Sequence, residues 1–72
     1  MVIKDSDKIR KELGEKLKAV REKAKLTQAE VAARAEVHVN YYARIERGEE
    51  NPSFEKLQGI MKALDIKSLD VI

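Results

Sequence analysis

Apolar residues recur every three or four positions along most of the chain, and the residues between them are largely charged. From Lys8 onward this spacing predicts one amphipathic helix. Its buried stripe consists of Ile9, Leu13, Leu17, Val20 and Ala24. Gly14 falls inside this helix, where glycine costs about 1 kcal/mol relative to alanine, and a close approach by another helix would account for it. Residues 1–7 are expected to form an N-terminal tail.

Two short helices separated by a tight break follow. Thr27 is expected to be an N-cap, and Glu30 lies at the spacing of a capping box. This helix runs to about Ala35, and a second runs from about His38 to Arg47. Gly48 suits a left-handed C-terminal cap. Residues 27–47 therefore predict a helix-turn-helix unit.

A fourth helix is predicted beyond a polar loop at residues 49–52. Ser53 is its expected N-cap and Asp65 ends it. Its apolar stripe consists of Phe54, Leu57, Ile60, Met61 and Leu64. Residues 66–72 are expected to add a turn or a short helix. No strand-like alternation occurs, so we predict an all-α fold of four to five helices forming one domain over residues 8–72.

Composition excludes several classes of function. The chain has no cysteine and one histidine, which excludes a disulfide framework and argues against a metal site. No apolar run is long enough to cross a membrane, and we expect a cytoplasmic protein without a cofactor or a small-molecule ligand. The sequence contains no nucleophile and base at a spacing that would suggest an enzyme. The formal net charge of +2 does not by itself indicate nucleic acid.

The second helix of the helix-turn-helix unit carries an outward face that suits base reading. Val39, Asn40 and Arg44 fall on this face, which begins at the helix N-terminus. Arginine bonds bidentately to guanine, asparagine to adenine, and valine can pack on a thymine methyl group. Gln28 and Lys25, at the start of the preceding helix, are candidate phosphate contacts. The alternative is that this polar face is simply solvated.

The segment from Leu13 to Ile66 resembles the Cro/C1-type (XRE-family) helix-turn-helix domain. The matching pieces are Arg21, Leu26-Thr27-Gln28, Val31-Ala32, Arg44-Ile45-Glu46-Arg47-Gly48, Asn51-Pro52-Ser53, Leu57 and Ala63-Leu64. The resemblance implies a five-helix, lambda-repressor-like bundle. It also implies a sequence-specific regulator that binds a double-stranded DNA operator with its third helix in the major groove.

The resemblance also assigns roles to single residues. It implies base contacts by three residues of the third helix, with His38 and Tyr41 as flanking candidates. It implies a phosphate contact by Gln28. The expected base-contact residues are Val39, Asn40 and Arg44, and the weaker expected phosphate contacts are Lys25 and Arg47. Arg21 and Glu46 match a pair that forms a structural salt bridge.

Two positions depart from the family pattern. Glu36 stands where glycine is usual in the turn, and a left-handed conformation there costs a residue with a side chain about 1 kcal/mol. Val39 replaces a residue that is often polar, which suggests a thymine methyl group at the matching position of the operator. Both departures leave the fold intact and affect the sequence preference.

Alternative functions and assemblies stay open. The same fold serves as a protein-interaction module in antitoxin-like and coactivator-like proteins. A homodimer on a palindromic operator is expected, with the C-terminal apolar residues as its interface or packed back on the fourth helix. These residues are Ile66, Leu69, Val71 and Ile72. The chain is either an autonomous regulator or the DNA-binding part of a longer one.

Overall fold

The computed structural model describes residues 4–66 and, within them, four α-helices and no strand. They are α1 (Lys4–Lys23), α2 (Gln28–Ala35), α3 (Val39–Glu46) and α4 (Phe54–Ala63). The predicted all-α class is confirmed. A short element was expected at residues 66–72. Of these residues only Ile66 is described, and it is not helical. The dimer candidates Leu69, Val71 and Ile72 lie outside the described residues.

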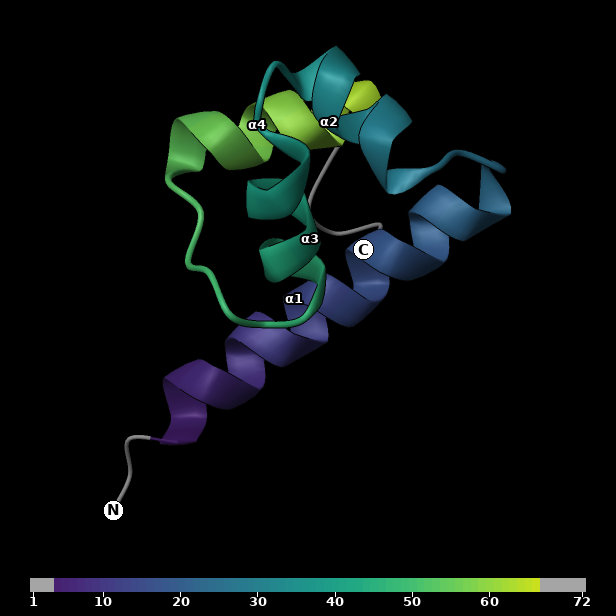
Figure 1. The fold of residues 1–72 in the computed structure, drawn as a ribbon. Helices are drawn as coiled ribbons and strands as arrows, with labels where there is room; N and C mark the ends of the chain where they lie inside the picture. The colour runs from purple at the N-terminus through teal and green to yellow at the C-terminus, as the bar shows by residue number, and fades with distance from the viewer. Residues whose placement is uncertain (1–3, 67–72) are drawn as a thin grey trace.

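The helix-turn-helix unit occupies the middle of the bundle. α3 packs against both α1 and α2, and α2 packs in turn against α4. Figure 1 shows α1 crossing beneath α3, with α2 and α4 together on the far side of α3. The loop between α3 and α4 passes close to α1 before it returns to the layer formed by α2 and α4. α3 is therefore held in its orientation by both α1 and α2.

The core draws side chains from all four helices. Its fully buried members are Leu17, Val31, Tyr42, Ile45 and Ile60. Ile9 and Phe54 were predicted to be in the apolar stripes, but Ile9 is 63% exposed and Phe54 is 67% exposed, so both predictions are wrong. Ile9 lies in the first half of a 20-residue helix, which is longer than the 8- to 10-residue helices packed beside it. Phe54 is the first residue of α4 and lies at the end of its helix.

α1 begins four residues earlier than its apolar spacing predicts. Residues 4–7, assigned to the N-terminal tail, are helical, so that boundary is wrong. Asp7 forms an ion pair with Arg10 one turn later, and acidic side chains in a first turn interact favourably with the helix dipole. At the other end α1 stops at Lys23, and Ala24, predicted to be in the stripe, is exposed.

Gly14 marks the closest approach of α1 to α3. A Cβ atom built on Gly14 would lie 2.4 Å from the backbone oxygens of both Ile45 and Glu46. Only a residue without a side chain allows the two helices to meet at this distance. The predicted reason for a glycine inside α1 is thereby confirmed.

All four helices end in the same way, with a residue in the left-handed conformation. The two hydrogen bonds that define a Schellman motif form in each case. The left-handed residues are Lys25 (φ 60°), Glu36 (φ 60°), Gly48 (φ 78°) and Asp65 (φ 59°). Three of the four carry a side chain, which makes this conformation less favourable.

Candidate nucleic-acid interface

The capping residues predicted for α2 set the start of the helix-turn-helix unit. Glu30 N–H donates to Thr27 Oγ1 at 3.1 Å, and Thr27 N–H donates to Glu30 Oε1 at 2.8 Å. The backbone hydrogen bond from Thr27 also holds the pKa of the Glu30 carboxyl below its usual value. The predicted capping box is therefore confirmed.

The turn between α2 and α3 depends on Glu36. This residue adopts φ 60° and ψ 42°, and Val37 N–H donates to Ala32 O at 3.0 Å. Glu36 thus adopts the left-handed conformation of a turn in which glycine is usual, although it carries a side chain. Only residues 36–38 join α2 to α3, so this turn sets the direction in which α3 begins.

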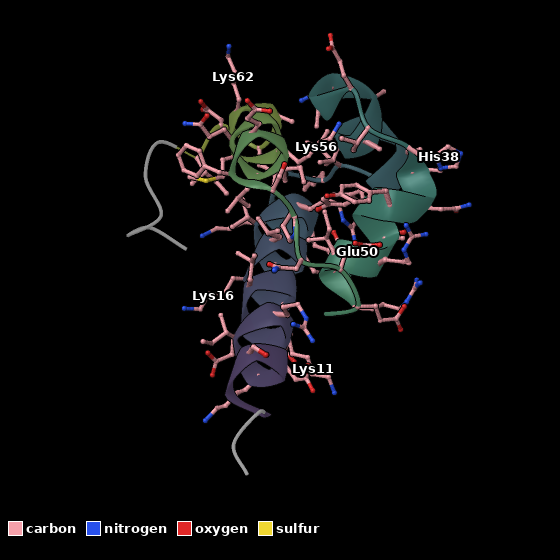
Figure 2. The ribbon with its side chains drawn as sticks, turned by 90° about the vertical axis from the view of Figure 1, so that its left-hand side faces the viewer. Lys11, Lys16, His38, Glu50, Lys56 and Lys62 are labelled. Atoms are coloured by element: carbon pink, nitrogen blue, oxygen red, sulfur yellow. The ribbon has the colours of Figure 1, made fainter. Side chains whose placement is uncertain are left out.

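His38 caps the N-terminus of α3. Asn40 N–H donates to His38 Nδ1 at 3.0 Å, which leaves Nε2 directed away from this hydrogen bond. The side chain is exposed, and Figure 2 shows His38 pointing away from the bundle at one end of α3. His38 thus combines a structural role in the helix with a position at the outer surface.

α3 divides into a buried face and an outer face. Tyr42, Ile45 and Glu46 are buried against the bundle. Val39, 36% exposed, and Asn40 lie at the outer surface of the first turn. Tyr41, predicted to flank the base contacts, is half-buried and packs partly against the core, so its ring has less access to a ligand than its neighbours.

Arg44 is held by a partner that the sequence did not indicate. Its Nε donates to Glu50 Oε2 at 3.0 Å, and the two side chains are 41% and 31% exposed. Glu50 belongs to the loop after α3, and Figure 2 shows it beside that helix. No residue spacing in the sequence predicted this contact, because it depends on the path of the loop.

Arg21 and Glu46 form the predicted structural salt bridge between α1 and α3. Arg21 Nε donates to Glu46 Oε2 at 2.7 Å, and Arg21 Nη2 donates to Glu46 Oε1 at 3.1 Å. A further bond from Arg21 Nη1 to Leu26 O, at 2.9 Å, fixes the entry to α2. The hydrogen bond to Glu46 raises the pKa of the Arg21 guanidinium above its ordinary value.

Gln28 joins the same buried cluster. Its Nε2 donates to Glu46 Oε1 at 2.8 Å, so one of its two amide hydrogens is directed inward. Burial alone would raise the pKa of the Glu46 carboxyl, but the hydrogen bonds from Arg21 and Gln28 hold it below its ordinary value. Gln28 therefore has a structural partner in addition to the phosphate that we predict for it.

The Tyr42 hydroxyl lies buried in this region without a hydrogen-bond partner among the described residues. Burial raises the pKa of the Tyr42 phenol well above its usual value. The ring is fully buried and contributes apolar surface to the core. We assign Tyr42 to the scaffold of α3 and not to its outer face.

The two weaker phosphate candidates are both exposed. Lys25 occupies the left-handed position between α1 and α2. Arg47 Nη2 lies 3.1 Å from Glu49 Oε1, and both side chains are more than half exposed. The hydrogen bond from Arg47 holds the pKa of Glu49 below its usual value. An exposed pair of this kind is weak and leaves Arg47 accessible to a phosphate.

Metal-binding clusters and membrane-spanning helices are both absent from residues 4–66. No cluster of three or more His, Asp or Glu side chains there has a geometry suited to a metal ion. No helix in that range is long and apolar enough to span a membrane. The predictions that the protein needs no metal or cofactor and is not an enzyme stay predictions.

Comparison with known proteins identifies the class to which this arrangement belongs. Residues 17–72 match the helix-turn-helix family. The chain belongs to the Cro/C1-type (XRE) helix-turn-helix family of DNA-binding transcriptional regulators.

Two curated relatives are similar to the chain. It is 40% identical over 55 residues to the immunity repressor protein of Bacillus phage phi105, a match that covers 76% of this chain and 38% of the repressor. It is 31% identical over 68 residues to the control protein C.BamHI of Bacillus amyloliquefaciens, covering 93% of this chain and 84% of the control protein. The chain thus spans less than half of the first relative and most of the second.

Proposed function

We propose that the protein is a sequence-specific regulator that places α3 in the major groove of an operator. The observation that carries this proposal is the division of α3 into two faces. Tyr42, Ile45 and Glu46 anchor it to the bundle, while Val39 and Asn40 lie at the surface of its first turn. An α-helix fits the major groove when one face is free of its own scaffold.

The chemistry of the outer face suits base edges. Arg44 offers paired N–H donors to guanine, Asn40 can bond adenine on both of its major-groove atoms, and Val39 can contact a thymine methyl group. His38 and Tyr41 flank these residues, and we assign them secondary contacts. Each bidentate contact discriminates against a wrong base by about 1–3 kcal/mol.

Phosphate contacts by Gln28, Lys25 and Arg47 complete the proposed interface. All three lie at the ends of α2 and α3, where the chain turns. Gln28 retains a second amide hydrogen beyond the one given to Glu46. Such contacts orient the protein on the duplex and carry no base preference of their own.

A homodimer on a palindromic operator forms part of the proposal. Helix-turn-helix dimers bind two half-sites about one helical turn apart, so their spacing reports the assembly. Both relatives carry names of regulatory proteins, a repressor and a control protein. They support regulation of transcription, and repression is the form that the first name suggests.

Selection of bound duplexes from a random pool tests the proposal. We expect enrichment of one sequence containing two inverted half-sites about 34 Å apart, with affinity that falls steeply as salt rises. No enriched sequence, together with salt-insensitive binding to a protein partner, would instead favour the protein-interaction module. The same experiment identifies the operator.

A further inference from the structure

The loop after α3 is locked to the residue that carries the proposed guanine contact. Gly48 N–H donates to Ile45 O at 3.0 Å, and Glu49 N–H donates to Arg44 O at 2.8 Å. Gly48 adopts φ 78°, which this Schellman motif requires. The backbone just before Glu50 is therefore bonded to the backbone of Arg44 itself.

This backbone arrangement brings the Glu50 carboxylate to one side of the Arg44 guanidinium. The contact uses Nε, at 3.0 Å from Glu50 Oε2. An arginine side chain has five N–H donors, and the other four are on its two terminal nitrogens. The bond to Glu50 thus restrains the long side chain while most of its donors stay available for a base.

We propose that Glu50 is a positioning residue that raises the sequence specificity of Arg44. This inference rests on the proposed function of α3. A restrained arginine loses less conformational freedom on binding a base edge than a free one does. The carboxylate also repels DNA phosphates, so Glu50 weakens binding to every DNA sequence. It nevertheless raises the ratio of the affinity for the correct sequence to the affinity for other sequences.

The neighbouring pair of Arg47 and Glu49 provides a matched control. It has the same charges and a similar distance of 3.1 Å, but its side chains are 55% and 54% exposed. Among the described residues, Glu49 forms no hydrogen bond or ion pair with the Arg44 side chain. Removing Glu49 therefore takes the same charge from the same loop without releasing the arginine of α3.

The test compares affinities for two duplexes at one salt concentration. One is the duplex enriched from the random pool, and the other is a scrambled duplex of equal length. The ratio of the two affinities is measured for the wild type, Glu50→Ala, Glu50→Gln, Glu49→Ala, Arg44→Ala and the double variant Arg44→Ala with Glu50→Ala. Circular dichroism confirms that each variant is folded.

Glu50→Ala is expected to bind scrambled DNA more tightly and to lose roughly three- to tenfold in the ratio, less than removal of the whole arginine. Glu50→Gln retains an oxygen that can accept from Nε, so its ratio should lie between those of the wild type and Glu50→Ala. Glu49→Ala should strengthen binding to both duplexes equally. In the Arg44→Ala background, Glu50→Ala should leave the ratio unchanged.

An unchanged ratio in Glu50→Ala would overturn the inference and leave the proposed function standing. A ratio that falls equally in the presence and absence of Arg44 would also overturn it, because Glu50 would then act through another group. If the wild type enriches no duplex at all, the proposed function fails first. The two failures are therefore distinguishable.

Discussion

The Arg21 guanidinium and the Glu46 carboxylate meet side by side, with Nε–Oε2 and Nη2–Oε1 distances of 2.7 and 3.1 Å. This pair joins residues 25 positions apart in the sequence and ties α1 to the inner face of α3. The Glu46 side chain is 2% exposed and that of Arg21 is 11% exposed. The orientation of the outer face of α3 therefore depends on a buried pair on its other side.

Glu46→Ala should destabilise the protein by about 2–4 kcal/mol, since it leaves the Arg21 charge and the Gln28 amide without their buried partner. Urea unfolding followed by circular dichroism measures the change. Glu22→Ala is the control, because Glu22 lies 3.9 Å from Arg21 with a side chain 59% exposed. It should change stability by less than about 0.5 kcal/mol. Equal effects of the two substitutions would contradict the role of Glu46.

The stability that Glu46 contributes should depend on pH in the acidic range. Its pKa in the folded protein lies below the ordinary value of 4.5, so the unfolded chain takes up the proton first as the pH falls. The contribution is complete above about pH 4.5 and is lost as the pH falls through the folded pKa.

Glu46→Gln removes this carboxyl and keeps the size of the side chain. We expect the difference in unfolding free energy between wild type and Glu46→Gln to be constant from about pH 7 to 5 and to shrink below that range. Other carboxyls titrate in both proteins and cancel in the difference. Parallel curves down to about pH 3 would mean that Glu46 has no lowered pKa.

Gly14→Ala should destabilise the protein by about 2 kcal/mol or more, although alanine is the better helix former. The added Cβ would lie 2.4 Å from two carbonyl oxygens of α3. Gly59→Ala, inside α4, is the matched control, because its nearest atom would be Ala35 O at 3.4 Å. This second variant should be neutral or more stable by up to about 1 kcal/mol. Thermal melts of both proteins test the opposite signs.

Glu36→Gly should stabilise the protein by roughly 1 kcal/mol, since glycine adopts the left-handed conformation of the turn without steric cost. Ala33→Gly places the same residue inside α2, where it should cost about 1 kcal/mol. The two melting temperatures should therefore move in opposite directions. A lower melting temperature for Glu36→Gly would show that the Glu36 side chain makes a favourable contact that outweighs its backbone conformation.

The local features of the fold were predictable from the sequence. Thr27 and Ser53 cap helices as expected, because capping involves residues only two or three positions apart. Ile9 and Phe54 were assigned wrongly to the core. Periodicity identifies the face of a helix but does not show whether a neighbour covers each part of that face.

Contacts between distant residues were predictable only in part. The pair of Arg21 and Glu46 followed from family resemblance, because no spacing rule joins residues 25 positions apart. The bond between Arg44 and Glu50 was missed, as was the inward hydrogen bond of Gln28. Each depends on where a loop or a helix end lies in three dimensions.

Arg44→Ala tests most directly whether α3 reads base edges. The affinities of the wild type and the variant are measured for the selected duplex and for a scrambled one. Arg10→Ala, which removes an arginine from α1, is the control for loss of charge. We predict that Arg44→Ala weakens binding to the selected duplex by about 1–3 kcal/mol and weakens binding to the scrambled duplex much less. The variant should also lose its preference at one base pair. An equal loss on both duplexes would contradict the claim and make Arg44 a phosphate contact.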